Sequence, residues 1–207
     1  MAALMVGFDL DMTLIDSRPG IAACYRALTA KTGVHVDAEL AVSRLGPPLR
    51  TEIAHWFPRE RVDEAVDIFR ELYPAYAITP SVLLPGAREA VAAVRARGGR
   101  VMVVTSKRDR LARLHLDHLG LVVDELVGDL FAEEKATALR THGATLYVGD
   151  HVADMVAAEA AGVPGIGVAT GPCDRDELRD AGARLVLDDL TGFPAALDRI
   201  IGLALEQ

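Results

Sequence analysis

Short apolar runs alternate with longer helical patterns along most of this chain, and the alternation limits the folds it can adopt. Six runs predict strands, at residues 4–8, 100–106, 125–128, 145–150, 165–170 and 183–189. Because the runs are nearly continuous in apolar character, they are typical of parallel strands covered on both faces. Ala- and Leu-rich segments, most of which end in Gly, follow them and predict helices. The pattern therefore predicts an α/β fold with a doubly wound, Rossmann-like parallel sheet.

One segment interrupts the alternation. Residues 18–82 carry only helical patterns, which are separated by the loop sequences LGPPL and FPRE. The Pro and Gly residues of TPSVLLPGA then mark the return to the sheet. We therefore expect an α/β core domain made of residues 1–17 and 83–207, with an all-helical domain inserted at residues 18–82.

Composition excludes several classes of protein. The chain has 207 residues, of which 51% are hydrophobic and 25% charged, and no stretch approaches the roughly 18 apolar residues of a membrane helix. The first residues lack the basic flank of a signal peptide, and the two cysteines lack CxxC spacing, so we expect a cytoplasmic protein. The net charge of −8 argues against nucleic acid as the main partner, although small anions could still bind a locally positive pocket.

Polar side chains follow three of the predicted strands, at the point where each strand ends. They are Asp9 and Asp11 after the first strand, Thr105 and Ser106 after the second, and Asp150 with Asp154 after the fourth. In an open parallel sheet, ligands bind outside the carboxyl ends of the strands. Two aspartates one residue apart repel each other, and a cation would relieve that repulsion. Hard carboxylate oxygens suit Mg²⁺, so the sequence predicts a magnesium site at this edge.

Four motifs resemble those of a known family. DLDMT at residues 9–13, VVTS ending at residue 106, the lysine at Lys135 and GDHVAD at residues 149–154 are similar, in order, to the motifs of the haloacid dehalogenase-like hydrolase superfamily. The phosphoglycolate phosphatase-like branch, in which a helical cap follows the first motif, fits best. The resemblance covers essentially the whole chain and implies that residues 18–82 are the cap.

The resemblance implies a phosphatase mechanism. Asp9 would be the nucleophile that forms an aspartyl-phosphate, and Asp11 the general acid and base, which holds a proton that Asp9 has lost. Mg²⁺ would be held by Asp9, by the backbone carbonyl of Asp11 and by Asp150, with Asp154 orienting this set of ligands. Relatives that cleave carbon–halogen bonds lack an aspartate at the position of Asp11, because a halide needs no proton, so Asp11 favours a phosphate monoesterase.

The same resemblance implies which residues bind the substrate, a small phosphorylated metabolite. Thr105, Ser106 and nearby backbone N–H groups would hold phosphate oxygens, and Lys135 would neutralise charge in the transition state. Lys107 is a further candidate for substrate contact. The cap loop SRLGPPLRTE contains Gly46 and offers Arg50, or alternatively Arg44, to a substrate carboxylate or second phosphate.

Several alternatives stay open on sequence alone. Thr105 and Ser106 could cap the helix that begins near Asp109, and Lys135 could be a solvated surface residue. His151 stands where a small hydroxyl residue is common, and we interpret it as a partly exposed residue at a helix start. Rival functions are a phosphosugar mutase of the same superfamily and a phosphoacceptor signalling domain. A monomer and a homodimer are equally compatible with the sequence.

Overall fold

The computed structural model describes residues 3–205, with side chains described as far as residue 201. Its centre is a six-stranded sheet in the order β5-β4-β1-β6-β7-β8, in which all neighbours are parallel. The strands are β1 (Met5–Phe8), β4 (Arg100–Val104), β5 (Glu125–Val127), β6 (Leu146–Gly149), β7 (Gly165–Val168) and β8 (Leu185–Leu187). The predicted doubly wound sheet is confirmed, and each strand lies within the run that predicted it.

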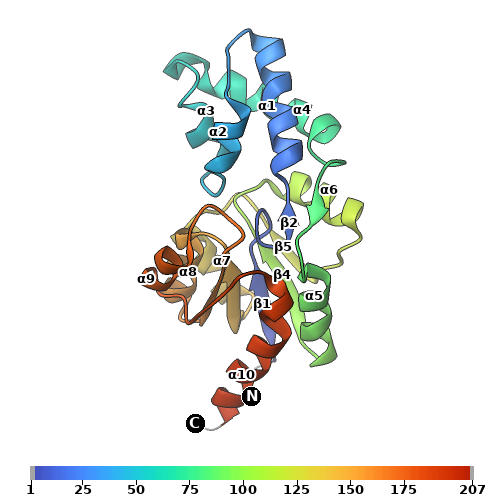
Figure 1. Ribbon diagram of the computed structural model, residues 1–207, viewed down its shortest axis with the longest axis vertical. Helices are drawn as coiled ribbons and strands as arrows, with labels where there is room; N and C mark the ends of the chain where they lie inside the picture. The colour runs from blue at the N-terminus through green and yellow to red at the C-terminus, as the bar shows by residue number, and fades with distance from the viewer. Residues whose placement is uncertain (1–2, 206–207) are drawn as a thin grey trace.

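Helices cover both faces of this sheet (Figure 1). One face packs against α5 (Ala87–Ala96), α6 (Asp109–Leu119) and α10 (Phe193–Leu205), and the other against α7 (Glu133–Thr141) and α8 (Val152–Ala161). Successive side chains along a strand point to opposite faces of the sheet. Phe8 of β1 points toward the layer of α5, α6 and α10, where its ring centre lies 5.3 Å from that of Phe193 in α10. A short helix, α9 (Arg175–Asp180), packs beside β7 and β8.

Four helices follow β1 in the chain and form a separate helical unit at the carboxyl edge of the sheet (Figure 1). They are α1 (Arg18–Thr32), α2 (Ala38–Ser43), α3 (Leu49–Ile53) and α4 (Val62–Tyr76), with a 3-10 turn η1 (Arg59–Arg61) before α4. The unit has its own apolar core, in which the rings of Tyr25 and Phe69 lie 4.7 Å apart. The expected all-helical character of the insertion is confirmed, whereas the division of the chain at residues 17/18 and 82/83 stays a prediction.

A two-residue antiparallel strand pair joins the helical unit to the sheet. It is formed by β2 (Ile15–Asp16) and β3 (Val82–Leu83), with Ile15 opposite Leu83. Sequence reasoning missed this pair because two residues show no periodicity. None of the described helices is long and apolar enough to cross a bilayer.

Candidate active site

Three carboxylates converge at the carboxyl edge of the sheet. Asp9 follows β1, Asp150 follows the neighbouring strand β6, and Asp154 lies in the first turn of α8. All three are buried, and one ligand oxygen from each lies within 4.8 Å of the others. The sequence-predicted residues are thus brought together by strand adjacency.

The electrostatics of this cluster fit a divalent cation. Burial, together with the charges of Asp154 and Asp11, raises the pKa of Asp9 to about 7, although Lys135 lowers it. Burial and the neighbouring Asp9 likewise raise the pKa of Asp150 well above its ordinary value. Three buried carboxylates, of which only Asp9 and Asp154 contact the ammonium group of Lys135, therefore carry excess negative charge. A divalent metal ion bound by hard oxygen ligands would compensate it.

Lys135 lies inside the cluster. Its side chain is 3% exposed, and Nζ lies 3.0 Å from Asp9 Oδ1, 2.7 Å from Asp154 Oδ1 and 3.1 Å from the hydroxyl oxygen of Tyr147. Burial alone would lower the pKa of this ammonium group, but the two carboxylates raise it well above its ordinary value. The alternative of a solvated surface lysine is therefore wrong.

The segment that delivers Lys135 has a strained backbone. Ala132, the residue before α7, has φ 48° and ψ −125°, which an L-residue rarely adopts. Such strain persists only where the surrounding structure imposes it, and it is common at functional sites. Helix α7 begins directly after this strained residue. Lys135 lies in the first turn of α7, and its Nζ contacts the carboxylates of Asp9 and Asp154.

Three residues that support the cluster escaped sequence reasoning. Thr13 Oγ1 donates to Asp150 Oδ1 at 2.7 Å, and the Tyr147 hydroxyl lies 3.2 Å from Asp154 Oδ1. At Gly171, any Cβ atom would overlap the Asp150 carboxylate. Its position in the sequence could have identified Tyr147. It lies in β6 two residues before Gly149, and this position places its side chain on the sheet face that packs against α7.

Asp11 occupies a different environment from Asp9. Its carboxylate accepts from Lys107 Nζ and from Ser17 Oγ, and it is not part of the three-carboxylate cluster. Burial would raise its pKa, but the positive charge of Lys107 and these two hydrogen bonds outweigh burial and lower it. We expected Asp11 to hold a proton more readily than Asp9, but the directions of the two pKa shifts give the opposite order.

The loop after β4 contains Thr105, Ser106 and Lys107. Thr105 is buried and its Oγ1 accepts from the Lys107 amide at 3.2 Å, while Ser106 Oγ donates to the Gly46 carbonyl of the helical unit at 3.1 Å. The residue that precedes α6 is Arg108, and no side chain caps this helix. The alternative in which Thr105 or Ser106 caps α6 is therefore wrong.

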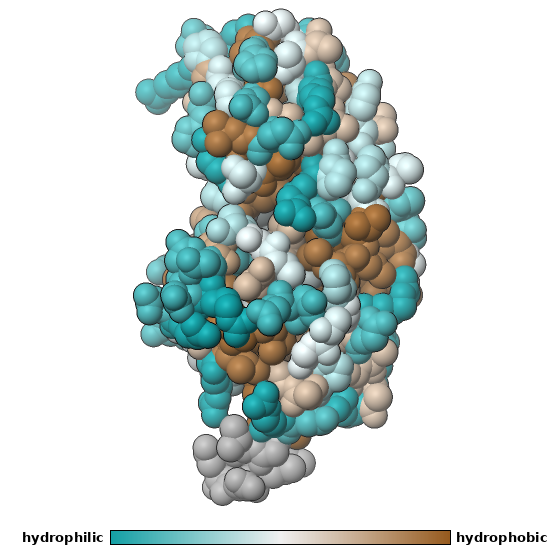
Figure 2. Space-filling model, in the orientation of Figure 1, coloured by the Kyte–Doolittle hydropathy of each residue, from teal (hydrophilic) through white to brown (hydrophobic). Residues whose placement is uncertain are grey.

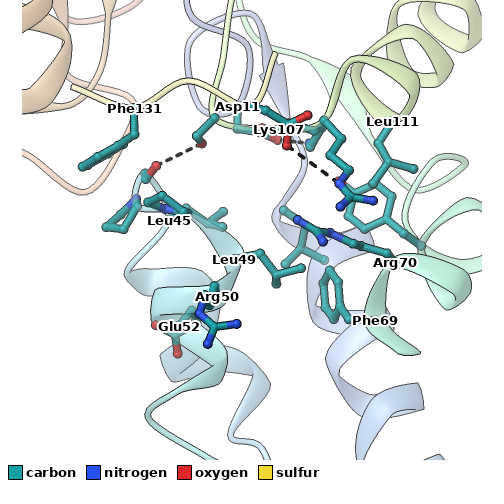
Figure 3. Close-up of a pocket in the computed structure, with 18 of the residues that line it drawn as sticks. Asp11, Leu45, Leu49, Arg50, Glu52, Phe69, Arg70, Lys107, Leu111 and Phe131 are labelled. Atoms are coloured by element: carbon teal, nitrogen blue, oxygen red, sulfur yellow. Dashed lines mark hydrogen bonds and ion pairs between the residues drawn. The ribbon is translucent and has the colours of Figure 1, made fainter. Parts of the chain in front are cut away.

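A cavity of about 190 Å³ lies between the helical unit and the loops at the sheet edge. Figure 2 shows the surface hollowed between these two parts, and Figure 3 shows the side chains that line the cavity. Asp9, Asp11, Gly46, Ser106 and Lys107 line it, as the sequence suggested. Sequence reasoning missed the lining residues Phe69, Arg70, Tyr73, Arg108, Leu111 and Phe131, because only the tertiary position of the helical unit identifies them.

The two arginines proposed from the cap loop also line the cavity, but each is already paired. Arg44 donates to both carboxylate oxygens of Glu52, at 2.6 and 3.0 Å. Arg50 forms an ion pair with Asp63. Neither guanidinium group is therefore free of a carboxylate partner.

His151 begins α8, as interpreted from the sequence. Its Nδ1 accepts from the Ala153 amide at 3.0 Å, and burial lowers its pKa. The ring also touches the helical unit, because a Cβ atom added at Gly46 would lie 2.7 Å from His151 Cδ2. His151 therefore marks where the cap loop meets the sheet edge.

The fold and the site define an α/β enzyme whose buried aspartates and lysine are covered by a helical insertion. Residues 6–168 match the family model described as haloacid dehalogenase-like hydrolase, and the chain belongs to this family. The resemblance stated from the four motifs is thereby confirmed, and so is the prediction of a hydrolase.

The chain is also similar to individual members of the family. It is 31% identical to a phosphoglycolate phosphatase of Rhodospirillum rubrum, over 90% of each chain, and 30% identical to one of Chromobacterium violaceum, over 89% of this chain and 92% of the relative. Among solved structures, a haloacid dehalogenase-like family hydrolase from Streptococcus pneumoniae shares the fold with a TM-score of 0.83, at 24% identity over 94% of this chain and 98% of that one. The two phosphoglycolate phosphatases confirm the phosphoglycolate phosphatase-like branch and an enzyme of the phosphatase type.

Proposed function

We propose that this protein is a Mg²⁺-dependent phosphatase that hydrolyses a small phosphate monoester, phosphoglycolate-like or nucleotide-like, through an aspartyl-phosphate. The observation that carries the proposal is the position of Lys135 Nζ, 3.0 Å from Asp9 and 2.7 Å from Asp154, beside the Asp150 carboxylate. An ammonium group so placed can neutralise phosphate charge next to the nucleophile.

In the first half of the proposed reaction, an oxygen of Asp9 attacks phosphorus. The bond from Asp9 to phosphorus forms while the bond from phosphorus to the alcohol oxygen breaks, and Asp11 gives its proton to that oxygen. In the second half, Asp11 takes a proton from water as the water oxygen attacks phosphorus. The bond to Asp9 then breaks and inorganic phosphate leaves.

Asp11 needs a proton for the first half, although Lys107 lowers its pKa in the structure. A phosphate dianion in the same cavity adds negative charge near Asp11 and so favours its protonation. Asp11 then acts as acid only when substrate is present.

Asp9, Asp150 and Asp154, together with the backbone carbonyl of Asp11, would hold Mg²⁺. Bound there, the ion would offset the charge repulsion between an anionic nucleophile and an anionic substrate. Thr13 and Gly171 position the Asp150 carboxylate for this role. Thr105 and Ser106 supply hydroxyl groups to the phosphate.

The helical unit would act as a cap, with boundaries at residues 18–82. Its loop reaches the core through the bond from Ser106 to Gly46, and it encloses the small cavity. An enclosed cavity supports a small-molecule substrate rather than the exposed surface that a signalling domain needs for its partner. We also propose a cytoplasmic location, with a monomer or a homodimer as the working form.

Turnover of p-nitrophenyl phosphate tests the proposal. We expect Mg²⁺-dependent release of phosphate in the wild type and none in Asp9→Asn. Continued turnover in Asp9→Asn would contradict the role of Asp9 as nucleophile. Stoichiometric phosphorylation without turnover would favour a signalling domain, and interconversion of sugar 1- and 6-phosphates would favour a mutase.

A further inference from the structure

A threonine after β7 makes a long-range bond to the turn that carries Asp11. Thr170 lies two residues beyond the end of β7, and its Oγ1 donates to the Met12 carbonyl at 2.5 Å. Among the described residues, this carbonyl accepts from no other group. The bond joins the end of β7 to the turn after β1, although β6 lies between these two strands in the sheet.

The turn after β1 has a backbone that needs support from outside. Met12 has φ 60°, in the left-handed region that residues other than glycine rarely adopt, and its side chain is buried. The amides of Leu14 and Ile15 donate to the Leu10 carbonyl, at 2.9 and 3.1 Å, and close the turn on itself. A strained conformation persists only where the surrounding structure imposes it, and the bond from Thr170 is such a constraint.

The same two segments also meet at Asp150. Gly171, the residue after Thr170, packs so closely against this carboxylate that a Cβ atom there would overlap Oδ2. Thr13, the residue after Met12, donates to Oδ1 of the same carboxylate at 2.7 Å. The turn, the Asp150 carboxylate and the loop after β7 thus form a closed ring of contacts, in which the bond from Thr170 to Met12 is one link.

The conformation of Met12 affects two groups that are proposed to hold Mg²⁺. Its φ angle fixes how the preceding peptide group, which contains the Asp11 carbonyl, lies relative to the rest of the turn. It also fixes where the turn places Thr13, which bonds the Asp150 carboxylate. Loss of an outer group that orients metal ligands typically lowers metal affinity or activity by about 10- to 100-fold.

We propose that Thr170 is a positioning residue for the reaction. Its hydroxyl group holds Met12 in the left-handed conformation and thereby orients the Asp11 carbonyl and the Thr13 hydroxyl group. The inference rests on the proposed phosphatase function and adds to it a residue whose hydroxyl group donates to the backbone rather than to the clustered carboxylates.

Two substitutions of Thr170 separate its hydroxyl group from its shape. Thr170→Val keeps the shape and removes the donor, whereas Thr170→Ser keeps the donor. In calorimetric titrations with Mg²⁺ alone, we expect Thr170→Val to weaken the affinity by about 10- to 100-fold and Thr170→Ser to stay within about threefold of the wild type. An unchanged affinity in Thr170→Val, or equal losses in both variants, would overturn the positioning role.

Turnover of p-nitrophenyl phosphate gives a second readout. At a Mg²⁺ concentration that saturates the wild type, Thr170→Val should lower kcat by at least about tenfold and change KM by less than about threefold, because the substrate contacts remain. Thr170→Ser should restore kcat to within about threefold of the wild type. A loss confined to KM would overturn the positioning role and indicate a contact with the substrate.

Thr145 offers a matched control at the opposite end of the sheet. It is half-buried like Thr170, and its Oγ1 donates to the Met5 carbonyl at 3.0 Å and accepts from the Met5 amide at 3.2 Å. Thr145→Val therefore also removes a bond from a threonine to a methionine carbonyl, but far along β1 from the site. It should leave Mg²⁺ affinity and kcat unchanged, and losses equal to those of Thr170→Val would overturn the positioning role.

Hydrogen exchange separates failure of the positioning role from failure of the proposed function. Followed by mass spectrometry without metal or substrate, it reports the protection of the Leu14 and Ile15 amides in the turn. Thr170→Val should speed exchange there by at least about tenfold, while Thr170→Ser and the peptides of α5 stay unchanged. Unchanged exchange in Thr170→Val would overturn the positioning role. Faster exchange in a protein that shows neither Mg²⁺ binding nor turnover would overturn only the proposed function.

Discussion

The hydroxyl group of Tyr73 on α4 lies 2.9 Å from Nε2 of His115 on α6, so a buried hydrogen bond joins the helical unit to the α/β layers. The rings meet edge to face, with centres 5.6 Å apart. Within the described residues, Nδ1 of His115 has no partner. The bond to Tyr73 is thus the single side-chain hydrogen bond that His115 makes there.

We expect Tyr73→Phe to lower the free energy of unfolding by about 1–3 kcal/mol, because it leaves the buried His115 ring without its partner. Urea denaturation measures the change. Tyr76→Phe is the control, since Tyr76 lies on the same helix and is 44% exposed. Equal effects of the two substitutions would contradict a specific role for the bond to His115.

Acid should destabilise the protein partly through His115. Burial, followed by the charge of Lys107, lowers the His115 pKa to about 3, whereas an unfolded histidine titrates near 6.5. Between these pH values the unfolded chain binds a proton that the folded chain lacks. The stability due to neutral His115 is therefore complete above about pH 6.5 and is lost as the pH falls toward 3.

Unfolding free energies of the wild type and of His115→Phe, measured from about pH 7 to about pH 4, isolate this contribution. The wild type should lose up to about 1.4 kcal/mol more per pH unit than the variant. If the unfolding free energies of the two proteins changed equally with pH, His115 would not take up a proton on unfolding in this pH range.

Mg²⁺ should stabilise the folded protein through the clustered carboxylates. At about 100 times its dissociation constant, a ligand that binds only the folded state adds about 2.7 kcal/mol. We expect Mg²⁺ to raise the Tm of the wild type and to have little effect on Asp150→Asn, in which Thr13 can still donate to the amide oxygen. An equal rise in the Tm of both proteins would show that Mg²⁺ binds somewhere other than this carboxylate cluster.

Lys135→Met should abolish most activity while keeping the aliphatic length of the side chain. Loss of a preorganised positive charge next to the reacting phosphate costs about 10²–10³ in kcat. Steady-state kinetics at saturating Mg²⁺ measure the loss, and Lys31→Met, at an exposed position of α1, is the control. A kcat within about tenfold of the wild-type value would contradict the assigned role.

The residues that the sequence could identify were those whose position follows from strand order. Asp9 and Asp150 each follow the carboxyl end of a predicted parallel strand. Their side chains therefore lie close together once β1 and β6 are neighbours in the sheet. Lys135 followed from its motif, yet its burial became evident only with the fold. Six-residue helices such as α2 and α9 were missed because they contain fewer than two turns of periodicity.

The residues that the sequence could not identify depend on contacts between distant segments. Arg70 and Tyr73 of α4 line the cavity together with the loop after β4, and no local sequence pattern encodes that placement. The ion pair of Lys107 with Asp11 joins residues 96 positions apart, and it reverses the order of proton affinity that a pair of neighbouring aspartates suggested. Long-range pairing of this kind is decided by tertiary structure.

The strand pair of Ile15 with Leu83 brings together the two points at which the chain enters and leaves the helical unit. A segment whose ends are neighbours can be shortened, lengthened or replaced without pulling the sheet strands apart. The aspartates and Lys135 lie outside that segment, whereas Arg70 lies within it. Grafting the helices of another member of the family between Asp16 and Val82 should therefore yield a chimaera that retains its chemistry and acquires a new preference for substrate.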